Sequence, residues 1–253
     1  MDLFDLTGKA ALVTGSSRGL GRVFARALGE AGARVVLNSR HEEDLVEVQE
    51  DFGEDGIETY VSPFDVTDED AVNAAVADIE ENFAPIDILV NNAGVNLRGP
   101  FEKLPTRKWK HLMEVNLDGV FYVTRAVGAR MVEREAGKII NICSLMSEGG
   151  RPTTAPYAAS KGALKMLTRA LATEWGRYNI QVNGIGPGYF LSDMTRHMAE
   201  DPEWDQWVKQ SAAAGRWGRP DELKGVVVFL ASKASSFVNG QVIYVDGGWL
   251  ASL

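Results

Sequence analysis

Tyr157 and Lys161 are two side chains that can move a proton, and they stand four residues apart. On a helix this spacing places a phenol and an ammonium group on one face, one turn apart. A free tyrosine has a pKa of about 10, so it is a poor base near neutral pH unless a neighbouring cation favours its phenolate. The pair is therefore a candidate proton-transfer group, although the same spacing arises by chance in many helices.

A glycine-rich segment, TGSSRGLG at 14–21, lies between an apolar run and a helical pattern. Glycines permit positive φ and let the backbone approach a pyrophosphate, while the start of the next helix directs N–H groups at the negative charge. The spacing is G-x-x-x-G-x-G, which differs from the G-x-G-x-x-G of ordinary dinucleotide domains. A lone glycine loop is often only a turn, but this one opens an α/β series. It predicts nucleotide binding by Gly15, Ser17, Arg18, Gly19 and Leu20.

The end of the second predicted strand should contact the adenosine ribose of that nucleotide. An NAD enzyme usually has a carboxylate there, whereas residues 38–40 read Asn-Ser-Arg. Arg18 and Arg40 are suited to charge-assisted hydrogen bonds with a 2′-phosphate, unless both are merely solvated charges. NADP(H) is therefore predicted over NAD(H), which remains possible. Asp65 is expected to contact the adenine; the alternative is that it only caps a helix. The predicted contacts in this half of the site are Ser39, Arg40, Asp65 and Val66.

Seven apolar runs alternate with helical patterns along the chain. The predicted strands are 9–14, 34–37, 57–61, 86–90, 138–142, 180–185 and 241–245. The predicted helices are 21–31, 42–53, 69–83, 107–134, 155–178 and 221–231. This alternation is typical of a doubly wound parallel sheet covered by helices on both faces, and residues 1–253 read as one domain.

Residues 189–219 depart from this alternation. They follow the end of a predicted strand and contain short helical stretches but no predicted strand, as a lid over a ligand would. Trp204 and Trp207 stand three apart in this segment and are placed to cover a pocket. The alternative is that the two tryptophans only pack a small satellite cluster.

Composition limits the partners and the compartment. The net charge of −9 argues against nucleic acid or an anionic membrane as a partner. No apolar run approaches the roughly 20 residues of a membrane span, and residues 1–5 do not resemble a signal peptide. Cys143 is the single cysteine, so a reducing compartment, the cytoplasm, is expected. The three histidines lie outside any metal-binding motif, so no metal site is predicted.

Together these residues resemble the classical short-chain dehydrogenases/reductases over essentially the whole chain. The matching pieces are TGSSRGLG at 14–21, Asp65, NNAG at 91–94, Asn116, Ser144, Tyr157 with Lys161, and Pro187-Gly188. The resemblance implies a single seven-stranded Rossmann domain, a homotetramer, and a catalytic tetrad of Asn116, Ser144, Tyr157 and Lys161. It also implies cofactor contacts at Asn91, Ala93, Gly94, Tyr157, Lys161, Pro187, Gly188, Phe190 and Ser192. Many members carry threonine at the position of Ser192, which retains a hydroxyl for the nicotinamide amide.

Within that family the chain is similar to gluconate 5-dehydrogenases. The shared strings include NICS at 141–144, PGYF at 187–190, GRWG at 215–218 and SKAS at 232–235. The ending VDGGWLA at 245–251 also looks like a sister group that acts on 2-deoxy-3-keto sugar acids. The resemblance implies hydride transfer between NADP(H) and a secondary alcohol or ketone of a small sugar acid, with gluconate and 5-ketogluconate as the leading pair.

Oxidation of such an alcohol requires loss of a proton from oxygen as hydride leaves carbon. Tyr157 is predicted to take the proton. Lys161 and an oxidised nicotinamide are predicted to lower the pKa of the phenol from about 10 to about 7, which requires roughly 4 kcal/mol. Ser144 is predicted to hydrogen-bond to the substrate oxygen. Family resemblance implies that Asn116 supports a water chain to Lys161.

A sugar acid also requires recognition of its carboxylate and hydroxyls. Arg98 and Arg151 follow predicted strand ends and are the best-placed cations, while Glu148 is suited to accept hydrogen bonds from hydroxyls; all three are alternatively solvated charges. The predicted substrate contacts are Arg98, Ser144, Glu148, Arg151 and Tyr157.

Three other functions remain open on the sequence alone. They are a 2-deoxygluconate 3-dehydrogenase, a 3-oxoacyl-thioester reductase and a non-catalytic nucleotide-sensing protein. Basic residues near the expected mouth of the site suit an acyl carrier: Arg98, Lys103, Arg107, Lys108 and Lys110.

Overall fold

The computed structural model of the chain describes residues 3–192 and 195–252. These residues form seven strands in one parallel sheet, in the order β3-β2-β1-β4-β5-β6-β7. The strands are β1 (Ala10–Val13), β2 (Arg34–Leu37), β3 (Thr59–Val61), β4 (Ile88–Asn91), β5 (Gly137–Ile142), β6 (Ile180–Pro187) and β7 (Val242–Val245). The strand order reverses between β1 and β4, and the crevice at the carboxyl ends of these two strands is where α/β sheets bind ligands.

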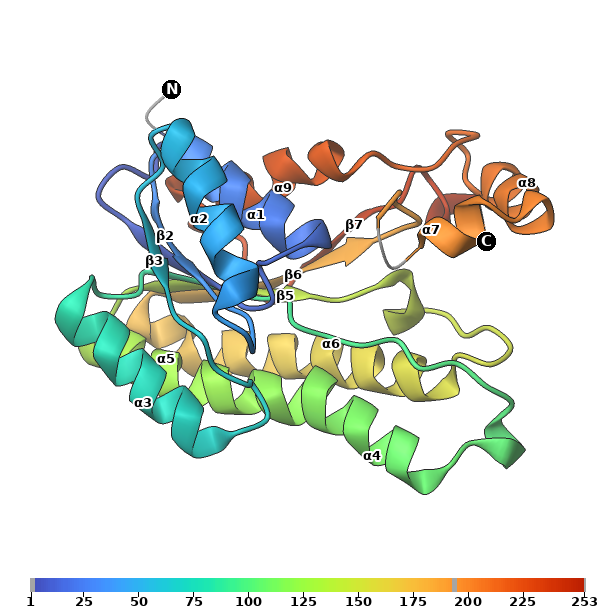
Figure 1. Cartoon of the computed structure of the whole chain (residues 1–253), viewed down its shortest axis with the longest axis horizontal. Coiled ribbons are helices and arrows are strands. Elements are labelled where there is room, and N and C mark those ends of the chain that lie inside the picture. The colour runs from blue at the N-terminus through green and yellow to red at the C-terminus, as the bar shows by residue number, and fades with distance from the viewer. Residues whose placement is uncertain (1–2, 193–194, 253) are drawn as a thin grey trace.

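Helices cover both faces of the sheet (Figure 1). The faces carry α1 (Gly19–Glu30), α2 (Glu43–Glu54) and α9 (Lys224–Ala231) on one side, and α3 (Glu69–Asn82), α4 (Thr106–Met113), α5 (Gly119–Arg134) and α6 (Ala155–Trp175) on the other. The central strands are buried on both faces and are rich in Val, Ile and Leu, as parallel strands require. One hydrophobic cluster joins the sheet to α1, α2 and α9, and a second joins it to α3 and α5. The predicted doubly wound Rossmann architecture is confirmed.

The lid predicted at 189–219 contains two further helices, α7 (Arg196–Ala199) and α8 (Pro202–Ser211). Residues 193 and 194 of that segment lie outside the described residues. Asp201 begins α8 because its carboxylate accepts hydrogen bonds from Glu203 N and Trp204 N. The two ends of the segment are pinned together, since Gly218 N donates to Tyr189 O at 2.9 Å and Leu191 N donates to Gly218 O at 3.0 Å.

The predicted helix over 107–134 is not one continuous α-helix. It consists of α4, a π-helical turn at Glu114–Asp118, and α5. The apolar periodicity runs through the turn, so the sequence pattern did not reveal it. Two other predicted helices include a short 3-10 turn, Gly176–Tyr178 after α6 and Pro220–Leu223 before α9. No helix in the described part of the chain is long and apolar enough to cross a bilayer.

Candidate active site

The glycine loop joins β1 to α1 and is tied to the loop that follows β4. Gly15 and Gly19 have φ of +64° and +56°, so both adopt the left-handed backbone that favours glycine. Asn92 Nδ2 donates to Thr14 O and Gly15 O at 3.0 Å, and Thr14 Oγ1 accepts from Asn92 N and Ala93 N at 3.0 Å. These bonds fix the floor of the crevice between β1 and β4.

Glycine is required at position 21 because the backbone there lies very close to Gly15 and Asn92. The sequence interpretation did not assign Gly21 to the site. A Cβ at this position would lie 2.1 Å from Gly15 O and 2.5 Å from Asn92 Nδ2. Both partners belong to the floor of the crevice, so neither can move without disturbing it. The signal that could have found Gly21 was the third glycine of the loop.

The end of β2 is organised by Asn38, which is buried. Its Oδ1 accepts from Gly15 N at 3.2 Å, and its Nδ2 donates to Ser62 O and Phe64 O at 3.1 Å. Ser39 Oγ is engaged with the backbone of His41. Beyond it, Arg18 and Arg40 are both exposed and form no ion pair with any residue among 3–192 and 195–252. The side chains predicted to meet a 2′-phosphate are therefore available.

Asp65 is not the cap of a helix. Asp68 caps α3 by accepting a hydrogen bond from Ala71 N at 3.0 Å, whereas Asp65 Oδ1 holds Thr67 N and Thr67 Oγ1. The adjacent Val66 is buried, and a Cβ on Gly119 of α5 would lie 2.9 Å from its side chain. The predicted contacts of Asp65 and Val66 with an adenine edge stay predictions.

Several predicted cofactor residues use their side chains inside the protein. Asn91 Nδ2 donates to Thr124 Oγ1 at 2.8 Å and to Asn141 Oδ1 at 2.9 Å, which braces β4 against β5. Phe190 is buried against Gly218. A Cβ on Gly188 would lie 2.7 Å from Asp246 Cα, so this glycine allows β6 to approach the end of β7. The predicted cofactor contacts of Asn91 and Phe190 stay predictions.

The four tetrad residues converge from three elements at the carboxyl edge of the sheet. Ser144 follows β5 and begins a 3-10 turn, Leu145–Ser147, with its Oγ accepting from Met146 N at 3.2 Å. Tyr157 and Lys161 lie on the first turns of α6. Lys161 Nζ donates to Ile142 O at 2.7 Å and lies 5.7 Å from the centroid of the Tyr157 ring.

Asn116 occupies the π-helical turn between α4 and α5, a local geometry that is frequent at functional sites. Its Oδ1 accepts from Val95 N at 2.8 Å, and its Nδ2 donates to Val95 O at 2.9 Å and to Ser160 Oγ at 3.1 Å. A Cβ on Gly94 would lie 3.3 Å from Asn116 Oδ1 and 3.8 Å from Lys161 Nζ. Asn116 thus joins the loop after β4 to α6, and its predicted support of a water chain stays a prediction.

The two ionisable members of the tetrad are shifted in opposite directions by burial. Burial raises the pKa of Tyr157 to about 12, and a hydrogen bond between the hydroxyls of Tyr157 and Ser144 opposes this rise. Burial lowers the pKa of Lys161 to about 8. The prediction that Lys161 and an oxidised nicotinamide together lower the pKa of the phenol concerns the protein with its cofactor bound and stays a prediction. In the protein alone, Lys161 Nζ is bound to a carbonyl oxygen and burial dominates the pKa of Tyr157.

The predicted substrate cations lie together, and Glu148 is turned to other partners. Arg151 Nη1 donates to Tyr189 OH at 2.6 Å, and its guanidinium lies 3.4 Å from the centroid of the Trp207 ring. The guanidinium of Arg98 lies over Trp204 on the same lid helix.

The Glu148 carboxylate accepts hydrogen bonds from Lys165 Nζ and from Tyr244 OH, and these bonds hold the pKa of Glu148 below its usual range. A role for Glu148 toward hydroxyls stays a prediction.

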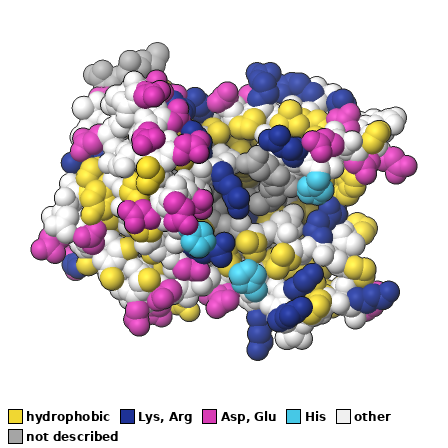
Figure 2. Space-filling model, in the orientation of Figure 1, with side chains coloured by type: hydrophobic (Ala, Val, Ile, Leu, Met, Phe, Trp, Pro, Cys, Tyr) yellow, Lys and Arg dark blue, Asp and Glu magenta, His cyan; other side chains and the backbone are white. Residues whose placement is uncertain are grey.

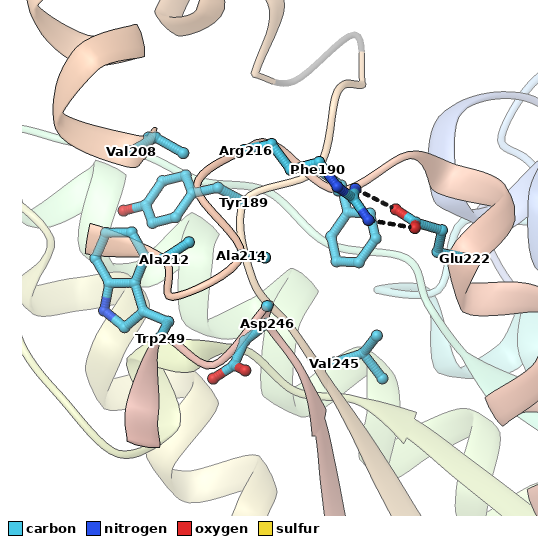
Figure 3. A pocket seen from close by; sticks show the side chains of 12 residues that line it. Tyr189, Phe190, Val208, Ala212, Ala214, Arg216, Glu222, Val245, Asp246 and Trp249 are labelled. Atoms are coloured by element: carbon cyan, nitrogen blue, oxygen red, sulfur yellow. Dashed lines mark hydrogen bonds and ion pairs between the residues drawn. The ribbon is translucent and has the colours of Figure 1, made fainter. Parts of the chain in front are cut away.

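Two of the cavities in the described part of the structure adjoin the segment predicted to be a lid. The larger of them, about 410 Å³, opens between Gly19 of the glycine loop and Leu191, Ser192 and Arg196 of that segment. The smaller, about 220 Å³, is enclosed by Tyr189, Phe190 and Trp249 and by the ends of β6 and β7, beside an ion pair of Arg216 with Glu222 (Figure 3). None of the tetrad residues lines either cavity. The larger one is the cavity that faces the predicted pyrophosphate site.

Charges are unevenly distributed on the face that carries the lid. Figure 2 shows Lys and Arg side chains around a hollow on the side of α4, α7 and α8, whereas Asp and Glu are frequent over α2 and α3. In the part of the chain that the structure describes, no group of three or more His, Cys, Asp or Glu side chains is arranged to hold a metal. The Lys and Arg side chains around the hollow contrast with the net charge of −9 of the whole chain.

Comparison with known proteins places this arrangement in a family. Residues 15–250 match the family model described as "Enoyl-(Acyl carrier protein) reductase", a model of short-chain dehydrogenases/reductases. The gluconate 5-dehydrogenase of Gluconobacter oxydans (strain 621H) is 51% identical over 252 residues, which cover 100% of this chain and 98% of that protein. The 2-dehydro-3-deoxy-D-gluconate 5-dehydrogenase of Formosa agariphila is 48% identical, over 100% of this chain and 97% of that protein.

A crystal structure of a gluconate 5-dehydrogenase from Burkholderia cenocepacia J2315, in complex with NADP and tartrate, is similar over the whole chain. It is 48% identical to this chain, with a TM-score of 0.97. The match covers 100% of this chain and 99% of that one. Its likeness extends to the sheet and to the helices that position the tetrad. The chain therefore belongs to the short-chain dehydrogenase/reductase family, and the protein is an NAD(P)-dependent dehydrogenase/reductase.

Proposed function

We propose that the protein interconverts gluconate and 5-ketogluconate, with hydride transfer between carbon 5 of the sugar acid and NADP(H). The observation that carries the proposal is the convergence of Ser144, Tyr157 and Lys161 at the carboxyl edge of the sheet, with Arg98 and Arg151 on the loops that follow β4 and β5 at the same edge. The full-length similarity to enzymes named for gluconate supports the substrate.

The roles of the chain's own residues follow from their positions. When bound, NADP⁺ supplies the acceptor for the hydride. Tyr157 takes the proton of the substrate hydroxyl during oxidation and returns it during reduction. Ser144 stabilises the charge that develops on the substrate oxygen through its hydroxyl. Lys161 is placed to hold the ribose next to Tyr157, and Asn116 fixes the loop and helix that carry these groups.

NADP(H) is the proposed cofactor because the described site fits its extra phosphate. Gly15 and Gly19 provide the left-handed turns of a phosphate-binding loop, and the larger cavity adjoins Gly19. Arg18 and Arg40 are exposed and carry no ion pair in the described ranges, and residues 38–40 include no acid. A carboxylate at this place would repel a 2′-phosphate, whereas two guanidinium groups attract it.

Arg98 is the better of the two candidates for the substrate carboxylate. Its Nε is inaccessible to solvent and has no hydrogen-bond partner among the residues that the structure describes. Leaving such a donor unpaired costs about 1–3 kcal/mol, which a bound carboxylate recovers. Arg151 already donates to Tyr189 OH.

A substrate and cofactor screen tests the proposal. Purified protein is expected to reduce NADP⁺ with gluconate, to reduce NAD⁺ more slowly, and to oxidise NADPH with 5-ketogluconate. 2-Dehydro-3-deoxygluconate and 2-deoxygluconate are the closest competing substrates and are assayed beside them. Equal rates with both nucleotides would contradict the cofactor preference. Absence of activity on every sugar acid would contradict the substrate.

A 3-oxoacyl-thioester reductase is the second candidate, because a basic surface lies on and before α4. Lys103, Arg107, Lys108 and Lys110 are all exposed there, as docking of an acidic carrier protein would require. Activity on acyl thioesters with none on sugar acids would favour this candidate.

The finer statements about assembly and location are also proposals. A homotetramer is supported by apolar side chains left exposed on two neighbouring helices, Phe121 on α5 and Met166 on α6, which are 46% and 58% exposed. A cytoplasmic location is supported by the free thiol of Cys143.

A further inference from the structure

One lid residue contacts both cations at the mouth of the site. The ring centroid of Trp204 lies 5.0 Å from the guanidinium carbon of Arg98 and 4.7 Å from that of Arg151. Arg151 also covers Trp207 and Tyr189, but among the described residues Trp204 is the one ring that both guanidinium groups meet. These distances are within the range in which a ring face attracts a cation.

The contact joins two parts of the molecule. Arg98 lies on the loop after β4 and Arg151 on the loop after β5, and Gly99 N ties these loops together by donating to Thr153 O at 3.1 Å. Trp204 lies on α8 of the lid. Its ring is fixed from behind by Trp207, at 5.5 Å and nearly perpendicular. Trp204 is therefore the point at which the lid rests on both arginines.

The arrangement lacks a counter-charge. Two guanidinium groups that face one indole lie at most about 10 Å apart, which is comparable with the Debye length in physiological salt, so their repulsion is incompletely screened. Neither arginine forms an ion pair with a residue in the ranges 3–192 and 195–252, and Arg98 Nε is buried without a partner. An anion between the two groups relieves this repulsion and strengthens the contact with the lid.

We propose that Trp204 is a positioning residue that holds Arg98 and Arg151 for the carboxylate of the substrate. This inference rests on the proposed function. In the described contacts Trp204 touches neither the cofactor site nor the tetrad. The inference gives this tryptophan a part in selecting sugar acids over neutral polyols.

Two substitutions distinguish an effect of the aromatic ring face of Trp204 from an effect of the size of its side chain. Trp204→Met keeps an apolar side chain against Trp207 but removes the ring face, and Trp204→Phe keeps a ring. Trp204→Met is expected to raise KM for gluconate about tenfold while kcat falls less than about threefold, because a lost cation–π platform weakens substrate binding rather than the chemical step. Trp204→Phe is expected to restore most of the affinity. The dissociation constant for NADP⁺ is expected to stay within about twofold of wild type in both.

Gln206→Ala is the matched control, since Gln206 is exposed on the same helix and is outside the arginine contacts. A double-substitution test distinguishes positioning from general support of the lid. If Trp204 acts through the arginines, Trp204→Met changes kcat/KM less than twofold when Arg98 and Arg151 are both replaced by methionine.

Three results would each overturn the inference. The first is a KM for gluconate in Trp204→Met that matches the Gln206→Ala control. The second is a loss of kcat/KM on Trp204→Met that is equal in the wild-type and arginine-free backgrounds. The third is a loss of NADP⁺ affinity as large as the loss of gluconate affinity. A wild-type protein that is inactive on gluconate and on 5-ketogluconate overturns the proposed function instead, before any variant is made.

Discussion

A phenol and an ammonium group that are both withdrawn from water are costly to keep without a ligand. Tyr157 responds by holding its proton more tightly and Lys161 by holding its proton less tightly. Both shifts come mainly from desolvation. A positive charge near the two groups, such as that of an oxidised nicotinamide, would lower both pKa values, which opposes the rise for Tyr157 and adds to the fall for Lys161.

Replacing the buried ammonium group of Lys161 by an apolar side chain should stabilise the folded protein. The pKa of Lys161 is about 8 in the folded state and 10.5 when unperturbed, so from pH 8 to 10.5 the unfolded chain binds more protons and stability rises with pH. At pH 7 the difference amounts to about 3 kcal/mol, and loss of the bond to Ile142 O offsets about 1 kcal/mol.

Lys161→Met is thus expected to raise the free energy of unfolding at pH 7 by about 1–2 kcal/mol and to make the rise between pH 8 and 10.5 smaller than in wild type, while abolishing turnover. Urea unfolding of both proteins at pH 7, 9 and 10 measures both effects. Lys138, with a pKa also lowered to about 8 by burial, and Cys143, with a pKa raised to about 11, titrate in the same window in both proteins, so the measured quantity is the difference between wild type and variant. A variant less stable than wild type at pH 7 would contradict the assigned cost of burial.

Tyr157→Phe separates an enzyme from a nucleotide sensor. The substitution removes the proton donor but keeps the ring, so turnover is expected to fall by about 10²–10⁴-fold while NADP⁺ still binds. Steady-state rates and the quenching of intrinsic fluorescence by NADP⁺ measure the two properties. Retention of full activity would exclude Tyr157 as the proton-transfer group.

At the residue scale, the sequence predicted which residues gather at the site better than it predicted their hydrogen-bond partners. The positions of Tyr157 and Lys161 follow from helical spacing, and Gly15 and Gly19 follow from the demands of a phosphate loop. The bond from Lys161 Nζ to Ile142 O and the direction of the Asn91 side chain depend on how strands meet, and no local pattern encodes either. The same holds for Glu148, whose partners Lys165 and Tyr244 come from α6 and β7.

At the scale of elements, the glycine loop depends on backbone packing as much as on ligand binding. Gly21→Ala would place a Cβ against Gly15 O and Asn92 Nδ2. It is expected to lower the free energy of unfolding by about 2–4 kcal/mol and to weaken NADP⁺ binding at least tenfold.

Gly53→Ala on α2 is the matched control for this prediction. A Cβ at Gly53 has no atom within 4 Å and the residue is helical, so the change is expected to be neutral or to stabilise by up to about 1 kcal/mol. Thermal unfolding and NADP⁺ titration of both variants provide the measurement. A Gly21→Ala protein that binds NADP⁺ like wild type would show that the loop tolerates a Cβ.

Elements that obey one periodicity were predictable, and those with a local irregularity were not. All seven strands were found because each is a short apolar run between helices. The π-helical turn at Glu114–Asp118 was missed because the helical pattern continues through it, although it is the turn that presents Asn116. Strand ends differ by a few residues, as for β3, which begins at Thr59 rather than at residue 57.

At the scale of the whole molecule, exposed apolar side chains on α5 and α6 lead to a prediction about mass. Light scattering is expected to give about 110 kDa, four times the 27.6 kDa of the chain. Phe121→Glu is expected to lower this mass by introducing unpaired charge at the interface, whereas Val46→Glu on exposed α2 is expected to leave it unchanged. A wild-type mass near that of one chain would contradict the homotetramer.

The closed stem of the lid has a consequence for how such a protein diversifies. The hydrogen bonds between Tyr189, Leu191 and Gly218 join the two ends of the segment next to the sheet, so whatever is inserted between them begins and ends at the same place. Closure entropy grows only slowly with loop length, so a longer segment between these two ends costs little closure entropy. We therefore expect that changes in the exposed parts of residues 195–211 can alter the preferred substrate while the hydride-transfer residues on the sheet edge stay in place.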